Sequence, residues 1–154
     1  MDDASRLIAI EEIKQLKARY FRAIDRKDWP LLKSVFTDNV LLDYRAAATD
    51  PSGNNLVPDS TGEILQGNAA AVANIESSLS GISTVHHGHM PEIEILSETE
   101  ATGLWAMSDI LGFPAGGPVT KMLGYGHYEE RYVRASEGWK IASLKLTRLR
   151  IETD

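Results

Sequence analysis

The apolar residues of this chain change their spacing near residue 83, and this change limits the possible folds more than any other feature. Before it, apolar side chains from Leu7 to Ile24 recur every three or four positions, which predicts an amphipathic helix over about residues 5–24. After it, β segments are expected at about 84–97, 101–113, 119–134 and 139–151, separated by the turn-forming stretches SETE, PAGGP and ASEG. Helices followed by strands predict an α+β fold, in which one face of a strongly curved antiparallel sheet wraps around the helices.

Two further helices are expected in the first half of the chain. Asp28 is a good N-cap for a short helix that has Pro30 in its first turn and ends near Phe36. Because only a few residues separate it from the first helix, the two form a helical hairpin. Asn68 is expected to cap a third, alanine-rich helix over about residues 69–79.

A strand and a long loop are expected between the second and third helices. Residues 39–47 alternate between the two faces of an extended chain, which is typical of a strand. The segment from Thr49 to Glu63 is rich in Pro, Gly, Asn and Asp, and it therefore predicts a surface loop. A loop of this length in a small domain often serves as a lid over a site.

Composition limits the chain to one acidic globular domain. At 154 residues and 43% hydrophobic content, residues 1–154 form a single domain with one core. The net charge of −6 argues against nucleic acid or an anionic membrane as a partner, and the absence of cysteine excludes disulfides and sulfur-ligated metal sites. Neither a signal peptide nor an apolar run of about 20 residues is present. We therefore expect a soluble, cytoplasmic protein.

Asp25 lies where the first helix ends, at the border of its buried face. A carboxylate is unfavourable at a helix C-terminus because the helix dipole is negative there, so a specific partner is indicated. The alternative is an ordinary solvated aspartate at the end of a helix.

Three of the four histidines, His86, His87 and His89, occur together and raise the question of a metal site. On a strand, His86 and His87 point to opposite faces, so at most two of the three converge without a bulge, and we expect no metal. A neutral histidine is instead a natural general base near pH 7. A carboxylate at its far nitrogen would orient the ring, and Asp25 is our candidate for that role.

The same strand has a conflict between its two faces. Ile93 and Ile95 lie on the opposite parity to His86, so a regular strand cannot bury both the isoleucines and the histidine. Either Gly88 and Pro91 mark a bulge that changes the register, or the isoleucines face outward into a subunit contact. We favour the bulge.

Four further polar side chains share faces with apolar residues. Asp109 is expected among large apolar side chains, either as a structural hydrogen-bonding group or as a site residue. Arg148 points to the apolar side of the last strand, where an arginine is rare unless it is paired or binds an oxygen atom. Tyr20 and Tyr44 either pack as ordinary aromatic residues or donate their hydroxyl groups to an enolate.

Blocks of sequence across nearly the whole chain resemble one known family. The blocks IEEIKQLKARYFRAIDRKDW, VLLDY, HHGHMPEIEILSETEATGLWAMSDIL and GHYEERYVRASEGWKIASLKLTRLRI are similar to the bile acid 7α-dehydratase (hydroxysteroid dehydratase) branch of the SnoaL-like, NTF2-like superfamily. The resemblance to scytalone dehydratase and hexachlorocyclohexane dehydrochlorinase is looser. The resemblance to this superfamily implies a cone-shaped α+β barrel, a cofactor-free enzyme and a homotrimer whose subunits contact one another through the outer face of the sheet.

The resemblance also implies a reaction and the residues that perform it. The reaction is a lyase step that removes water from a hydroxysteroid-like 3-oxo-4-ene, taking the proton at C6 and the hydroxyl at C7. The implied substrate is a hydrophobic, steroid-like polycyclic molecule. The catalytic residues are then His86 as base, Asp25 as its orienting carboxylate and Tyr20 as hydrogen-bond donor, and the substrate-binding residues are Tyr44, Asp109 and Arg148.

Two other functions are compatible with these residues. The same dyad could serve an isomerase, cyclase or dehydrohalogenase, and the fold also hosts non-catalytic modules that bind hydrophobic ligands. The segment from Thr49 to Glu63 is longer than in the bile acid 7α-dehydratases of gut bacteria, and the C-terminal tail associated with those enzymes is missing after Arg150. Whether the substrate is a coenzyme A thioester, a free acid or another polycyclic alcohol therefore stays open.

Overall fold

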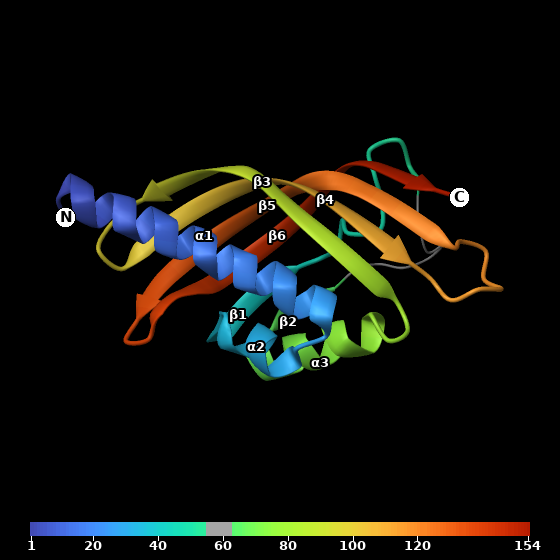
Figure 1. Ribbon diagram of the computed structural model, residues 1–154, viewed down its shortest axis with the longest axis horizontal. Coiled ribbons are helices and arrows are strands. Elements are labelled where there is room, and N and C mark those ends of the chain that lie inside the picture. The colour runs from blue at the N-terminus through green and yellow to red at the C-terminus, as the bar shows by residue number, and fades with distance from the viewer. Residues whose placement is uncertain (55–62) are drawn as a thin grey trace.

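A computed structural model describes residues 1–54 and 63–154. This part of the chain forms two helices, two strands, a third helix and then four strands (Figure 1). The expected order of helices and strands is confirmed, with bounds that differ by a few residues. The elements are α1 (Asp3–Arg26), α2 (Trp29–Ser34), β1 (Phe36–Asp43), β2 (Ile64–Gln66), α3 (Asn68–Ser78), β3 (Ser83–Ile95), β4 (Glu100–Gly112), β5 (Lys121–Ala135) and β6 (Gly138–Thr153).

Two details between β1 and α3 differ from the expectation. The three-residue strand β2 was not predicted, because so short a strand has no readable periodicity; it pairs antiparallel with β1. The N-cap of α3 is Gly67 rather than Asn68, whose side-chain amide instead donates to Asp38 Oδ1 at 3.1 Å. Residues 55–62 of the predicted loop lie outside the described residues, so a role as a lid stays a prediction.

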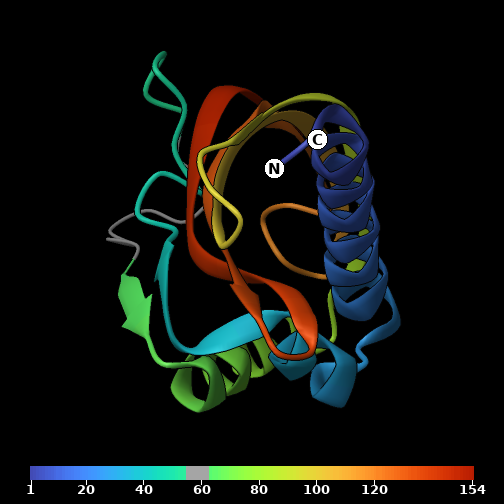
Figure 2. The ribbon, with the colours of Figure 1, turned by 90° about the vertical axis from the view of Figure 1, so that its left-hand side faces the viewer.

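The sheet has the strand order β2-β1-β6-β5-β4-β3. Strands β3 to β6 form the predicted antiparallel meander, whereas β1 joins β6 in parallel. Seen along the long axis of the molecule, the strands curl round and α1 lies along one side of the curl (Figure 2). The sheet remains open, because β2 and β3 are its two edges and do not pair with each other. This is the expected cone-shaped α+β architecture.

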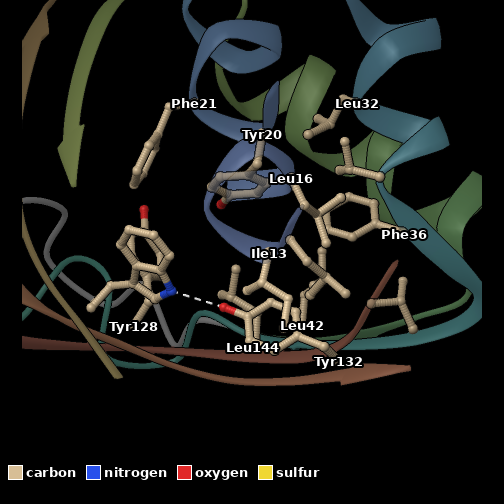
Figure 3. Close-up of a cluster of buried hydrophobic side chains, with 14 of the residues drawn as sticks. Ile13, Leu16, Tyr20, Phe21, Leu32, Phe36, Leu42, Tyr128, Tyr132 and Leu144 are labelled. Atoms are coloured by element: carbon tan, nitrogen blue, oxygen red, sulfur yellow. Dashed lines mark hydrogen bonds between the residues drawn. The ribbon is translucent and has the colours of Figure 1, made fainter. Parts of the chain in front are cut away.

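The apolar stripe of α1 packs against the inner face of this curl. Ile13, Leu16 and Tyr20 are almost completely buried and meet side chains from α2, β1, β5 and β6 (Figure 3). Leu7, which was predicted on the same stripe, is 67% exposed. Figure 1 shows that the first turns of α1 extend beyond the strands.

The predicted bulge in β3 is confirmed. Gly88 pairs with Met107, and the next paired residue, Pro91, lies opposite Trp105, so β3 contains one extra residue between these two pairs. The extra residue reverses the alternation, and Ile95 is buried. His86 and Ile95 can therefore both face inward although their sequence parity differs.

Lys17 is the buried charged residue of α1, although an amphipathic helix usually exposes its charged side chains. Its side chain is fully buried and forms an ion pair with the equally buried Glu130. Its ammonium nitrogen lies 3.6 Å from the centre of the Tyr128 ring, a cation–π arrangement. Glu130 also accepts from the hydroxyl of Tyr132, which accepts from Trp105 Nε1 at 2.8 Å. Burial lowers the pKa of Lys17 to about 8, although Glu130 opposes this effect.

Apolar side chains are also exposed on the outer face of the meander. Val85, Ile110 and Tyr125 from three neighbouring strands are each more than one-third exposed. This is the face expected to hold subunit contacts, and the homotrimer stays a prediction. Among the described residues, no helix has both the length and the apolar character needed to cross a membrane.

The buried ion pair predicts an asymmetric response to mutation. Lys17→Met leaves the Glu130 charge buried without its partner, and we expect it to lower the free energy of unfolding by about 3–5 kcal/mol. Lys14→Met, which breaks the exposed pair with Glu11, is the control and should cost less than about 1 kcal/mol. Urea denaturation of both variants measures the difference, and equal losses would contradict the role given to the buried pair.

Candidate functional site

A cavity of about 470 Å³ lies where the C-terminal end of α1 and helix α3 meet strands β2 to β6. Its walls are mostly apolar and include Ile24, Leu65, Ile75, Leu79, Ile82, Leu111, Phe113, Met122 and Leu146. Its polar lining includes five of the six predicted site residues: Tyr20, Tyr44, His86, Asp109 and Arg148. The sixth, Asp25, is bonded directly to His86. The fold thus gathers side chains from α1, β3, β4, β6 and the end of β1.

Asp25 and His86 form the predicted pair. His86 Nδ1 lies 2.7 Å from Asp25 Oδ1, and the backbone N–H of His86 donates to Asp25 Oδ2 at 2.9 Å. Because an ionised carboxylate only accepts hydrogen bonds, Nδ1 carries a proton, and in the neutral ring the free lone pair is therefore on Nε2. The ring is also stacked against Phe21, with 5.9 Å between ring centres. These contacts fix the orientation of the imidazole and leave Nε2 on the cavity side.

Two residues behind the pair hold Asp25 in place. Thr84 donates its hydroxyl proton to Asp25 Oδ1 at 2.9 Å, and Lys27 donates to the Thr84 oxygen at 3.1 Å. Lys27 reaches this position because it caps α1 in the left-handed conformation, with φ of 58°. Burial raises the pKa of Asp25, but the hydrogen bonds from His86 and Thr84 outweigh it, so the pKa is lowered overall.

On the other side of the imidazole lies a buried aspartate–arginine pair. Asp109 accepts two parallel hydrogen bonds from Arg148, each 2.8 Å long, and Arg148 Nε donates to the carbonyl oxygen of Ala47 at 2.8 Å. Asp109 Oδ2 is 3.9 Å from His86 Nε2. The pair fits because residue 124 is glycine: a Cβ atom there would overlap Asp109 Oδ1 and Arg148 Nη1.

Three tyrosines form the remaining polar wall. The hydroxyl groups of Tyr20 and Tyr44 lie 2.9 Å apart, and the Tyr128 ring packs edge-on against Tyr20. Burial is the largest of the effects that raise the pKa of Tyr20, and it also raises that of Tyr44, so both stay protonated as donors. Tyr128 was missed by sequence reasoning. The alternation of Met122, Tyr128 and Tyr132 along β5 was the signal available to find it.

The other two clustered histidines take no part in the cavity. His87 and His89 are exposed, and His89 Nε2 lies 3.3 Å from the Ser108 hydroxyl. Within residues 1–54 and 63–154, no three His, Cys, Asp or Glu side chains are grouped as metal ligands. The residues gathered at the cavity can supply proton transfer at His86 Nε2 and hydrogen bonding from neutral phenols.

The close packing at residue 124 predicts a large effect of a small change. Gly124→Ala would separate Asp109 from Arg148, and we expect it to lower the free energy of unfolding by about 3 kcal/mol or more. Gly117→Ala is the matched control, since a Cβ atom there meets only ordinary contacts, and it should change stability by less than about 0.5 kcal/mol. Thermal unfolding of both variants tests the assignment, and equal melting temperatures would refute it.

The lowered pKa of Asp25 predicts a pH-dependent contribution to stability. A carboxylate whose pKa is depressed by folding stabilises the protein above the ordinary aspartate value of about 4. That contribution is lost as the pH falls through the lower folded-state pKa. The stability difference between wild type and Asp25→Asn should therefore be largest above the ordinary aspartate pKa of about 4 and shrink as the pH falls below that value.

Urea unfolding across this pH range measures the difference. The exposed Glu76→Gln exchange is the control and should shift stability by less than about 0.5 kcal/mol at every pH. A wild type to Asp25→Asn difference that does not vary with pH would contradict the hydrogen-bonded arrangement described for Asp25.

Comparison with solved structures finds the same fold at low sequence identity. A protein assigned as a scytalone dehydratase from Novosphingobium aromaticivorans superimposes with a TM-score of 0.81 at 19% identity, over 99% of this chain and 92% of that one. A protein from Kribbella flavida gives 0.80 at 23% identity, over 96% and 95%. The LinA-type3 hexachlorocyclohexane dehydrochlorinase from Novosphingobium barchaimii gives 0.78 at 16% identity, over 99% and 94%.

These structural similarities establish the shared fold, and the family is shown by a match of the sequence itself. The SnoaL-like domain matches residues 5–145, which span both the helices and most of the sheet. The match includes Asp25, His86 and Asp109, while Arg148 lies just beyond it. The chain belongs to the SnoaL-like domain family.

Proposed function

We propose that this protein is a cofactor-independent lyase that eliminates water from a hydroxysteroid-like 3-oxo-4-ene. The observation that carries the proposal is the His86 ring, held at Nδ1 by Asp25 and presenting Nε2 to an apolar cavity. The SnoaL-like family and the dehydratase and dehydrochlorinase names of structurally similar proteins support an elimination.

The first step is removal of the C6 proton by His86 Nε2. This proton is acidic because the electrons it leaves behind are delocalised through the 4-ene to the oxygen at C3. As Nε2 takes the proton, the ring becomes a cation between two carboxylates: Asp25 at Nδ1 and Asp109, whose Oδ2 lies 3.9 Å from Nε2. Both stabilise the charge that forms, which is how a carboxylate raises the basicity of histidine.

The second requirement is stabilisation of the negative charge on the C3 oxygen of the dienolate. Tyr20 and Tyr44 are donors of suitable strength, because their phenols are neutral and their hydroxyl groups already lie together at 2.9 Å. Donors fixed in an apolar site stabilise a developing oxyanion more than water does, since they need no reorganisation. In this proposal Tyr20 donates to the oxyanion and Tyr44 orients it.

The dienolate then expels the C7 hydroxyl group, with the C6–C7 double bond forming as the C7–O bond breaks. The leaving hydroxyl group takes the proton held by the His86 imidazolium and departs as water. The imidazole thereby returns to its neutral form. Substrate minus one water gives the 3-oxo-4,6-diene, and no electrons are gained or lost. Arg148 serves this step indirectly, because its donors hold Asp109 and the Ala47 wall of the cavity.

The size and character of the cavity fit a polycyclic ligand. Its volume of about 470 Å³ falls in the range typical of small-molecule sites, about 300–1,000 Å³. Apolar side chains from α3, β2 and β4 surround the polar groups, as expected for a ligand with few polar atoms.

Ultraviolet spectroscopy tests the reaction, because dehydration of a 7α-hydroxy-3-oxo-4-ene steroid lengthens the conjugated system and produces a band at longer wavelength. We expect wild type to produce the band and His86→Ala to lower kcat/KM by about 10²–10⁴. Asp25→Asn should also lower it strongly, because the imidazole loses the carboxylate that fixes its tautomer.

The neighbouring His87→Ala exchange is the control, since His87 is exposed and lies on the other face of β3; its rate should equal that of wild type. A His86→Ala variant that folds and keeps the wild-type rate would refute the base assignment. Wild-type protein that binds the steroid without producing the band would refute the elimination.

A further inference from the structure

The cavity is surrounded by a stretch of sequence that has no basic side chain other than histidine. Between Arg45 and Lys121 the chain contains no lysine or arginine, whereas aspartates and glutamates occur throughout it. This stretch supplies most of the cavity wall, from Ala47 and Ala48 through α3 to Phe113 on the β4 side. A ligand in the cavity therefore meets very few groups that could balance a negative charge.

Arg148 is the cation among the described lining residues, and its charge is already balanced. Two of its nitrogen atoms donate to the two oxygens of Asp109, and the third donates to Ala47. Nη1 also lies 3.6 Å from Met107 Sδ. A carboxylate or phosphate of a ligand would have to displace the buried Asp109 to reach this guanidinium, which would leave Asp109 unpaired.

Two basic residues next to lining residues in the sequence, Lys27 and Lys121, do not line the cavity themselves. Lys27 bonds to Thr84, whose hydroxyl bonds to Asp25, and Lys121 lies 3.7 Å from Asp154. Glu63 adds a negative charge to the lining without a basic partner beside it in the cavity wall. Among the described residues that line the cavity, the Arg148 charge is balanced by Asp109, and Glu63 adds a negative charge.

We infer that the substrate is electrically neutral: a polycyclic enone alcohol without a carboxylate, phosphate or coenzyme A group. This inference rests on the proposed function and names the substrate class of the same site. An anionic side chain would lose water on entering the apolar cavity, where the described cation, Arg148, is already bound to Asp109, and such burial of an unpaired charge is costly. At the cavity rim it would meet the carboxylate of Glu63 instead.

Binding of three matched ligands tests the inference without depending on turnover. The ligands are 3-oxo-4-ene steroids without a 7-hydroxyl group, ending in an apolar side chain, a carboxylate or its coenzyme A thioester. Calorimetric titration at pH 8 should show the neutral steroid binding at least about tenfold more tightly than either anionic one.

A charge added to the cavity wall sharpens the test. Asn74 lines the cavity on α3, so Asn74→Lys should improve binding of the carboxylate relative to that of the neutral steroid by about two- to fivefold. Ala73→Lys adds the same charge to an exposed position of the same helix that does not line the cavity, and it should alter neither affinity.

The outcomes separate this inference from the proposed reaction. Equal or tighter binding of an anionic ligand by wild type would overturn the inference, whether or not any steroid is turned over, and so would failure of the neutral steroid to bind. Selective binding of the neutral steroid together with no dehydration of its 7α-hydroxy form would support the inference and refute the proposed reaction.

Discussion

The carboxylate of Asp25 joins the end of α1 to strand β3, and both the shape of the cavity and its chemistry depend on this contact. It accepts from the His86 ring, the His86 backbone and the Thr84 hydroxyl. These donors offset the unfavourable position of a carboxylate at the negative end of a helix. The helix end is thereby fixed beside the sheet, and the imidazole is fixed in one tautomer. One interaction thus serves the packing of α1 and the orientation of the candidate base.

The interior contains two buried ion pairs, one in the packed core and one in the wall of the cavity. Lys17 and Glu130 are fully buried, and the Lys17 ammonium group lies over the rings of Tyr20, Phe21 and Tyr128. Asp109 and Arg148 lie in the cavity wall, where the pair supports the wall on the Ala47 side and places a carboxylate near His86. Each pair is internally neutral, so the cavity can stay apolar although charged residues border it.

Sequence periodicity was sufficient to predict the α+β order, the antiparallel meander and the bulge after Gly88, because each leaves a local pattern of residues. Periodicity indicated which candidate residues share a face with apolar side chains, whereas their site roles came from the family resemblance. The Asp25–His86 contact joins residues 61 positions apart, so spacing alone could not establish it. The parallel pairing of β1 with β6 could not be predicted, because no local sequence pattern determines which distant strands pair. The burial of Lys17 could not be predicted from the helix alone, because a lysine on a helix is usually solvated and its partner Glu130 is 113 positions away.

The central claim is that His86 presents an unprotonated Nε2 to the cavity while Nδ1–H donates to Asp25. Nitrogen-15 NMR of the histidine side chains at about pH 8 tests it directly, with the His86 signals identified by their loss in His86→Ala. The account predicts a protonated Nδ1 with a strongly hydrogen-bonded proton and an Nε2 with the shift of a free acceptor. An Nε2–H tautomer, or a ring protonated at both nitrogens, would contradict the assignment of His86 as the base.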